Sequence, residues 1–183
     1  MVKRINKKKW KTIELTLSKK QIELLNEFNN KDVKEILFWW GARWWKTWWI
    51  ASIILLTMLK DPWIVWLVWR REYDDLRKTT LATILKVFRH YWLKESKSRI
   101  WMWINTFNVN LQTKDILLFN WSKIYFVPLK KQPSDPEFNW LWWYEITYFF
   151  IDEAQEVEEK AFNILKSRTT EKIKEYWLVW KWL

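Results

Sequence analysis

This chain of 183 residues must form all of its turns with a single glycine. A protein of this length carries about 13 glycines on average, at roughly 7% of residues. Glycine adopts positive φ angles without strain, so it normally occupies tight turns and helix ends. This sequence has 20 tryptophans instead. Their positions therefore decide which fold the backbone can form.

Several of the tryptophans stand where glycine is expected. Those at turns and helix ends are Trp63, Trp92, Trp121 and Trp177. Trp121 follows Asn120 between two apolar runs, where Asn-Gly is a strong hairpin signal. Tryptophan is unfavourable at such sites because its Cβ penalises positive φ and its indole exposes a large apolar area to water.

We therefore expect most of the tryptophans to be glycine in the natural protein. This happens when UGA codons that the source organism reads as glycine are translated as tryptophan. A few, such as Trp10 and Trp48, are candidates for genuine tryptophan. The alternative is a truly tryptophan-rich polypeptide, for example a membrane-active protein, and UGG codons at these positions would establish it.

Charge and composition limit the classes of protein to which this chain can belong. With 50% hydrophobic and 29% charged residues it is typical of a soluble globular protein of one domain. The lack of cysteine excludes disulfides and thiolate metal sites and favours the cytoplasm. Residues 1–12 form a basic arm without the apolar run of a signal peptide, and no apolar stretch reaches the ~18–20 residues of a membrane span. The net charge of +11 favours polyanionic partners, nucleic acid first and anionic membranes second, and the alternative is a basic surface without such a partner.

Apolar runs of strand length alternate with helical patterns along residues 13–183. The first helix is expected at 17–28, with Ser18 as its N-cap. The expected strands cover 35–38, 63–69 and 146–151, with a β-rich region at 101–127 and a further strand starting near 180. The other helices are expected at 47–60, 73–91 and 156–168, and loops at 39–46 and 128–145. This alternation predicts an α/β fold with a mainly parallel sheet covered by helices on both faces.

A phosphate-binding loop is predicted between the first expected strand and the helix that follows it. With glycine at positions 39, 40, 44 and 45, residues 40–47 match the pattern G-x-x-x-x-G-K-[ST]. The nucleotide-binding residues expected from it are Trp40, Gly41, Ala42, Arg43, Trp44, Trp45, Lys46 and Thr47. In a P-loop NTPase the backbone N–H groups hold the phosphates, Lys46 would reach the β- and γ-phosphates, and Thr47 would bind Mg²⁺. The cofactors predicted are therefore ATP and Mg²⁺.

Two adjacent acids follow the apolar strand expected at 146–151. Asp152 and Glu153 have little structural justification there, because a buried charge is costly unless a ligand uses it. Beside a P-loop, Asp152 would hold the metal and Glu153 would deprotonate the attacking water. The alternative is that both acids cap the next helix.

Most of the remaining polar candidates have more than one interpretation. Arg43 either stabilises charge on the γ-phosphate or is an ordinary surface arginine. Gln21 either reads the adenine edge or is an exposed helical glutamine. Arg70 and Arg71 either contact the DNA backbone, line the nucleotide site, or form a solvated pair. His90 is expected at a helix end, without a cluster of metal ligands around it.

The region 138–168 resembles the large terminase subunit of tailed phages. A loop with Leu141 between predicted glycines, and then Glu145, leads into the Asp-Glu-Ala strand. A helix ending in Leu-Lys-Ser-Arg at 165–168 comes next, as in that family. The glycine-rich loop with an internal arginine also matches. The resemblance covers residues 21–183, with its most specific parts at 39–47 and 138–168.

The resemblance implies an ATPase motor that translocates double-stranded DNA into a capsid. It implies the portal ring and the small terminase subunit as partners, a homo-oligomeric ring during packaging, and the host bacterial cytoplasm as location. We expect residues 13–183 to be a P-loop ATPase domain that is truncated at its C-terminus, with the family's nuclease domain beyond residue 183.

The printed tryptophans at positions 40, 44 and 45 depart from the family pattern. With indoles in the phosphate loop the chain is expected to be inactive, so the enzymatic prediction holds for the glycine form. Two alternatives remain open: another P-loop ATPase, such as a helicase, or a non-enzymatic binding protein if the tryptophans are genuine.

Overall fold

A computed structural model describes residues 18–30, 36, 43–100, 102–128, 134–153 and 157–169. The strands are β1 (Val65–Arg70), β2 (Lys94–Glu95), β3 (Thr106–Asn110), β4 (Asp115–Leu118), β5 (Lys123–Pro128) and β6 (Tyr148–Ile151). The helices are α1 (Lys19–Asn29), α2 (Arg43–Lys60), α3 (Tyr73–Leu76), η1 (Arg77–Leu81), α4 (Ala82–His90), η2 (Asn139–Trp143) and α5 (Glu159–Arg168). The predicted basic arm, nearly all of the strand at 35–38 and the strand near 180 lie outside the described residues.

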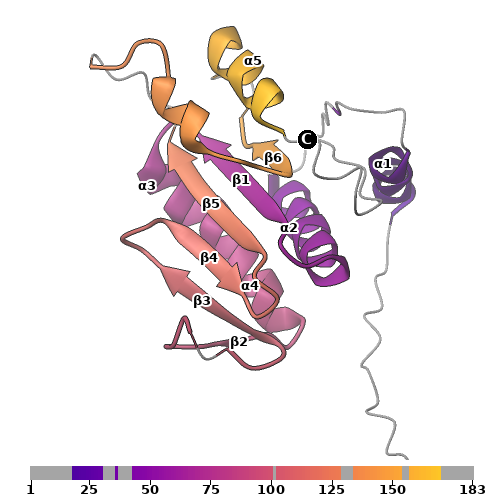
Figure 1. Ribbon diagram of the computed structural model, residues 1–183. Helices are drawn as coiled ribbons and strands as arrows, with labels where there is room; N and C mark the ends of the chain where they lie inside the picture. The colour runs from indigo at the N-terminus through magenta and orange to yellow at the C-terminus, as the bar shows by residue number, and fades with distance from the viewer. Residues whose placement is uncertain are drawn as a thin grey trace, which may run out of the picture.

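The six strands form one sheet in the order β2-β3-β4-β5-β1-β6 (Figure 1). Strand β1 runs parallel to both of its neighbours, β5 and β6. Strand β4 is antiparallel to β3 and β5, because short turns join it to both. Strand β2 is parallel to β3. The predicted mainly parallel sheet is therefore confirmed.

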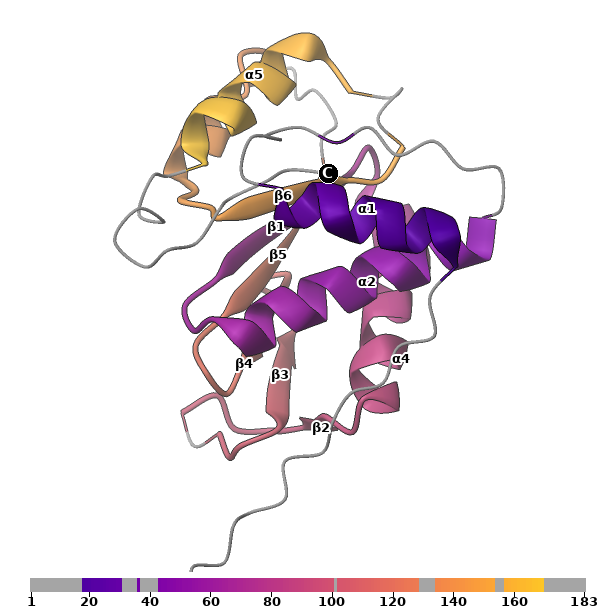
Figure 2. The same ribbon diagram turned by 90° about the vertical axis from the view of Figure 1, so that its right-hand side faces the viewer.

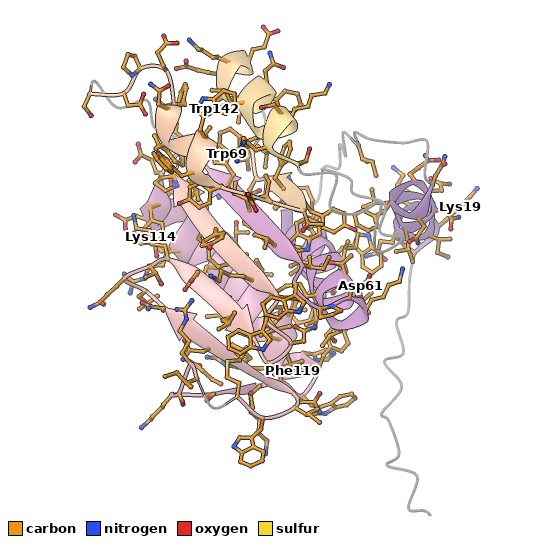
Figure 3. All side chains as sticks on the ribbon, in the orientation of Figure 1. Lys19, Asp61, Trp69, Lys114, Phe119 and Trp142 are labelled. Atoms are coloured by element: carbon orange, nitrogen blue, oxygen red, sulfur yellow. The ribbon has the colours of Figure 1, made fainter. Side chains whose placement is uncertain are left out.

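Helices cover both faces of the sheet, as predicted. The larger core lies between the sheet and the helices α1, α2 and α4. Helix α1 lies beside α2 (Figure 2), and its Phe28 stacks on Trp66 of β1, with ring centroids 6.5 Å apart. The smaller core lies on the opposite face, where η2 and α5 pack against β1 and β6. Trp69, labelled in Figure 3, belongs to this second core.

The helix termini agree with the local sequence signals at α1 and differ at α2. Ser18 caps α1 in a capping box with Gln21. Helix α2 begins at Arg43, so residues 43–46 are helical and the loop predicted for them is wrong. Tryptophan favours a helix over glycine by about half a kcal/mol per residue, so indoles at 44 and 45 support a longer first turn.

The single helix predicted at 73–91 is continuous but changes geometry in its middle. Between α3 and α4 the segment η1 is a π-helix. Such wide turns are rare and occur frequently at functional sites. The predicted loop at 128–145 likewise needs a correction, because it contains the 3₁₀ helix η2.

Three tryptophans at predicted glycine sites have positive φ angles: 65° at Trp63, 62° at Trp92 and 68° at Trp121. All three are at least half exposed. Trp121 closes the hairpin between β4 and β5, where its N–H donates to the carbonyl of Leu118 at 3.0 Å. The predicted turn positions are therefore confirmed, and the identity of the natural residue stays a prediction. Trp177 lies outside the described residues.

The buried tryptophans form a second group. The indole of Trp66 is fully buried and donates to the hydroxyl of Thr57 at 2.9 Å. The indole N–H groups of Trp49, Trp69 and Trp140 are buried and find no acceptor among the described residues. An unsatisfied buried N–H group costs about 1–3 kcal/mol. Trp66 is therefore accommodated better than these three.

None of the helices in the described residues combines the length and the hydrophobicity needed to cross a bilayer.

Candidate active site

A cleft of about 650 Å³ opens at one edge of the sheet, where β1 and β6 end and α2 begins. Neighbouring parallel strands end at the same edge, and ligands of open α/β sheets bind in the crevice outside those carboxyl ends. The cleft is lined by Lys46, Thr47, Trp48, Arg70, Lys78, Thr79, Ala82, Thr83, Lys86, Asp152 and Glu153. The two motifs that the sequence analysis singled out thus meet in one place.

Lys46 ends the first turn of α2 and Thr47 begins the second, and both are partly exposed and line the cleft. The N-terminus of a helix favours anions, because its first N–H groups have no partner within the helix and the helix dipole is positive there. For Arg43, Trp44 and Trp45 the structure describes only a helical backbone. Trp40, Gly41 and Ala42 lie outside the described residues.

Asp152 directly follows β6 and is only 5% exposed. Its Oδ2 atom accepts a hydrogen bond of 2.6 Å from the hydroxyl of Thr80. The guanidinium of Arg70 lies 3.5 Å from the same oxygen. Within the described part of the chain, neither the hydrogen bond nor the ion pair of this carboxylate falls on its Oδ1 atom. One carboxylate oxygen is thus held by the protein, and the other is left for a ligand of the cleft.

Glu153 lies next to Asp152 in the cleft and has a φ angle of 70°. A residue with a side chain pays about 1–3 kcal/mol for such a conformation, and strained residues cluster at active sites. The left-handed turn ends the extended backbone of β6 and leaves Glu153 partly exposed beside the buried Asp152. The alternative in which the two acids cap the next helix is not observed, because Glu158 is the N-cap residue of α5.

The two arginines after β1 lie in different surroundings. Arg70 lines the cleft, pairs with Asp152 and donates to the hydroxyl of Thr79 at 3.1 Å. Arg71 is exposed and is not among the cleft residues. The geometry of Arg70 favours the nucleotide-site interpretation over the DNA contact.

One wall of the cleft contains no residue of the predicted sequence motifs. It consists of one face of the helix α3–η1–α4, and its residues in the cleft are Lys78, Thr79, Ala82, Thr83 and Lys86. The spacing of Lys78, Ala82 and Lys86 is a helical i, i+4, i+8 pattern that marks one face, but it looks like an ordinary solvated face. The cleft therefore holds four basic side chains, Lys46, Arg70, Lys78 and Lys86, against two acids. Such a balance suits a polyanionic ligand.

Gln21 and His90 lie outside this cleft. Gln21 is 9% exposed, so the interpretation as an exposed glutamine is wrong. Its side-chain carbonyl accepts the N–H of Ser18 at 2.8 Å, which explains the burial. His90 ends α4 as expected and contacts the ring of Trp48. No cluster of three or more His, Asp or Glu side chains suited to a metal occurs among the described residues.

A larger hollow of about 940 Å³ lies against β1 and β5, away from these residues. Its walls include Trp63 and Trp121, which occupy predicted glycine positions, and Trp140 and Trp143, which flank Leu141 in the loop where glycines are also predicted. Because its shape depends on those indoles, the smaller cleft is the better candidate for chemistry.

Comparison with known proteins finds no matching family model and no matching curated protein. Two solved structures are similar in fold. One is the large terminase of a thermophilic bacteriophage, at 13% identity and a TM-score of 0.62, covering 86% of this chain and 37% of that protein. The other is the same terminase in complex with ADP, at 14% identity and a TM-score of 0.64, covering 85% and 37%.

This chain spans little more than a third of the length of those terminases. The resemblance inferred from the sequence is confirmed at the level of the fold: the chain has an α/β fold similar to that of a phage large terminase.

Proposed function

We propose that this chain is the ATP-hydrolysing motor portion of a viral large terminase subunit, which uses ATP hydrolysis to move double-stranded DNA into a capsid. The observation that carries the proposal is the meeting of Lys46 and Thr47 with Asp152 and Glu153 in one cleft. The fold of the chain and the ADP complex of the similar terminase support a nucleotide as the ligand.

Each of these side chains has a role in the proposal. The ammonium of Lys46 would bind the β- and γ-phosphates, and backbone N–H groups of the predicted phosphate loop, residues 40–45, would hold the phosphates as well. The hydroxyl of Thr47 and the Oδ1 atom of Asp152 fit Mg²⁺, which prefers oxygen ligands. When bound, Mg²⁺ neutralises charge on the phosphates.

Hydrolysis requires a base beside the γ-phosphate. Glu153 would accept a proton from a water molecule while the oxygen of that water forms a bond to the γ-phosphorus. The bond between that phosphorus and the β–γ bridging oxygen breaks, and ADP leaves with the electron pair. Arg43 in the loop, or Arg70 across the cleft, would stabilise the charge that develops on the phosphoryl oxygens.

The proposed partners follow from the motor function. Double-stranded DNA suits the net charge of +11. The portal ring, the small terminase subunit and further copies of this chain in a ring would complete the packaging machine in the host cytoplasm. The proposal assigns residues 13–183 to the ATPase and assigns no nuclease activity to them.

The first test uses the chain with glycine at positions 39, 40, 44 and 45, which we name the glycine-loop chain. In it, Lys46→Ala should lower ATP hydrolysis by about 10²–10³-fold or more, because a positive charge at the developing phosphate is lost. Phosphate release under saturating MgATP measures this. Lys60→Ala, at the exposed far end of the same helix, is the matched control and should keep full activity. Normal turnover in Lys46→Ala would refute the phosphate-loop assignment.

A second test compares the glycine-loop chain with the printed sequence. Backbone N–H groups must approach phosphate oxygens to ~2.7–3.2 Å, and indoles at positions 40, 44 and 45 would occupy that volume or force the loop open. About 1–3 kcal/mol of strain at each of three residues is comparable with the ~8 kcal/mol of a micromolar ligand. Titration with a fluorescent ATP analogue should therefore detect binding to the glycine-loop chain alone. Equal affinity of the two chains would contradict this steric argument.

A further inference from the structure

We propose that Thr80 is a positioning residue for the metal site: its hydroxyl holds Asp152 so that the second carboxylate oxygen faces the cleft. The proposal rests on the proposed ATPase function and adds a residue that lies outside both sequence motifs. Thr80 is separated from Asp152 by 72 positions in the chain.

The contact between the two side chains is short and buried. Thr80 is 1% exposed and Asp152 is 5% exposed. The hydroxyl of Thr80 donates to Oδ2 of Asp152 at 2.6 Å, in the range of strong hydrogen bonds to a charged oxygen. A hydroxyl buried in this way has its proton committed to the carboxylate, so it fixes the rotation of the carboxylate group.

The π-helix η1 brings two consecutive threonines to the same site. Side chains of consecutive residues in an α-helix point about 100° apart, since the helix has 3.6 residues per turn. A π turn contains more residues, so the angle between neighbours is smaller. Thr80 binds Asp152, while the hydroxyl of Thr79 accepts from Arg70 at 3.1 Å and donates to the carbonyl of Asp75 at 2.6 Å. The segment thus holds both members of the ion pair between Arg70 and Asp152.

Both protein contacts of the Asp152 carboxylate fall on Oδ2. The orientation that Thr80 imposes therefore keeps Oδ1 available for a cation or its bound water. Without the hydroxyl, the carboxylate would be free to rotate and to bind Arg70 with both oxygens. Arg70 would then compete with the metal for the same carboxylate.

The experiment compares Thr80→Val, which has the same shape without the hydroxyl, and Thr80→Ser, which keeps the hydroxyl, in the glycine-loop chain. The Mg²⁺ concentration at half-maximal ATP hydrolysis is measured at saturating ATP. Mg²⁺ affinity is also measured without turnover, from the rise of the unfolding temperature with Mg²⁺ in the presence of a non-hydrolysable ATP analogue. Loss of a residue that orients a metal ligand typically weakens metal affinity or activity 10–100-fold. Thr80→Val should raise the required Mg²⁺ concentration by about this factor, and Thr80→Ser should restore it to within about threefold.

Thr113→Val is the matched control, because it removes a threonine-to-aspartate hydrogen bond of 2.8 Å to Asp115, outside the cleft. Its Mg²⁺ dependence should be unchanged. If Thr80→Val unfolds, Thr80→Ala replaces it, and thermal unfolding identifies which variants are folded. An unchanged Mg²⁺ dependence in the hydroxyl-free variant, or equal impairment in Thr80→Ser, would overturn the positioning role. If Lys46→Ala also hydrolyses ATP normally, the proposed function itself fails.

Discussion

Asp115 and Asp152 are both buried beside an arginine and a threonine. They differ in how many of their carboxylate oxygens have a protein partner. Asp115, at the start of β4, binds the guanidinium of Arg99 through both oxygens, at 3.0 and 2.5 Å. Thr113 donates to Oδ1 of this aspartate. Asp152 receives both of its side-chain contacts on Oδ2 alone, and the distance to its arginine is 3.5 Å.

We propose that this difference separates a structural ion pair at Asp115 from a ligand site at Asp152. We call the bidentate pair at Asp115 closed because both carboxylate oxygens have a protein partner. The hydrogen bonds of this pair raise the pKa of Arg99. Such a group needs nothing further from solvent or ligand. Asp152 has an oxygen without a protein partner in the described part of the chain, at the wall of a cleft with four basic side chains. Both aspartates are almost fully buried beside an arginine, so we infer a ligand site at Asp152 from its incomplete set of contacts.

The largest expected effect comes from replacing each aspartate by asparagine in the glycine-loop chain. Asp152→Asn should lower ATP hydrolysis by orders of magnitude, because the charge that binds the metal is lost. Asp115→Asn should instead lower the free energy of unfolding by about 1–3 kcal/mol, since it breaks a charged hydrogen-bonded pair that is partly open to solvent. Phosphate release and denaturant unfolding are measured for both variants. If the two variants lose activity to the same degree, the distinction between a closed and an open site is wrong.

Replacing Glu153 should have a smaller effect, because it should lower ATP turnover and leave ATP binding nearly unchanged. Glu153→Gln should keep the affinity for MgATP within a few-fold and lower turnover by about 10²–10⁴-fold, because only the base is lost. Binding is measured with the fluorescent ATP analogue and turnover by phosphate release. Glu159→Gln, in the first turn of α5 and outside the cleft, is the control. Normal hydrolysis in Glu153→Gln would move the base to another residue, whereas loss of binding would place Glu153 with Asp152 at the metal.

Several helix ends and turns of this fold could be predicted because their signals lie within a few neighbouring residues of the sequence. The capping box of Ser18 and Gln21 involves residues three apart, so the start of α1 was predictable. The turns at Trp63, Trp92 and Trp121 were predictable because a left-handed residue is required after a helix end or inside a short hairpin. The π-helix η1 could not be predicted, because no residue pattern distinguishes its wider turn from that of an α-helix.

The candidate site likewise contains residues that the sequence predicts and residues that only the structure reveals. Lys46 with Thr47, and Asp152 with Glu153, could be found from the sequence because each pair follows or precedes a regular element with a recognisable pattern. Their meeting in one cleft also follows from the sequence, because parallel strands end at one edge of a sheet.

Only the tertiary structure showed which residues complete this site. The contacts of Thr80 and Arg70 with Asp152 depend on how the helix that contains η1 packs near the ends of β1 and β6, and Thr80 is 72 positions away from Asp152. Nothing local to Thr80 distinguishes it from the neighbouring threonines 79 and 83, since all three have the same side chain on the same helix. The sequence alone determined which residues are candidates for binding and hydrolysing ATP. The tertiary packing decided which other residues contact and orient those candidates. The physical reason is that a hydrogen bond depends on distance in space, which the pattern of residues along one helix does not contain.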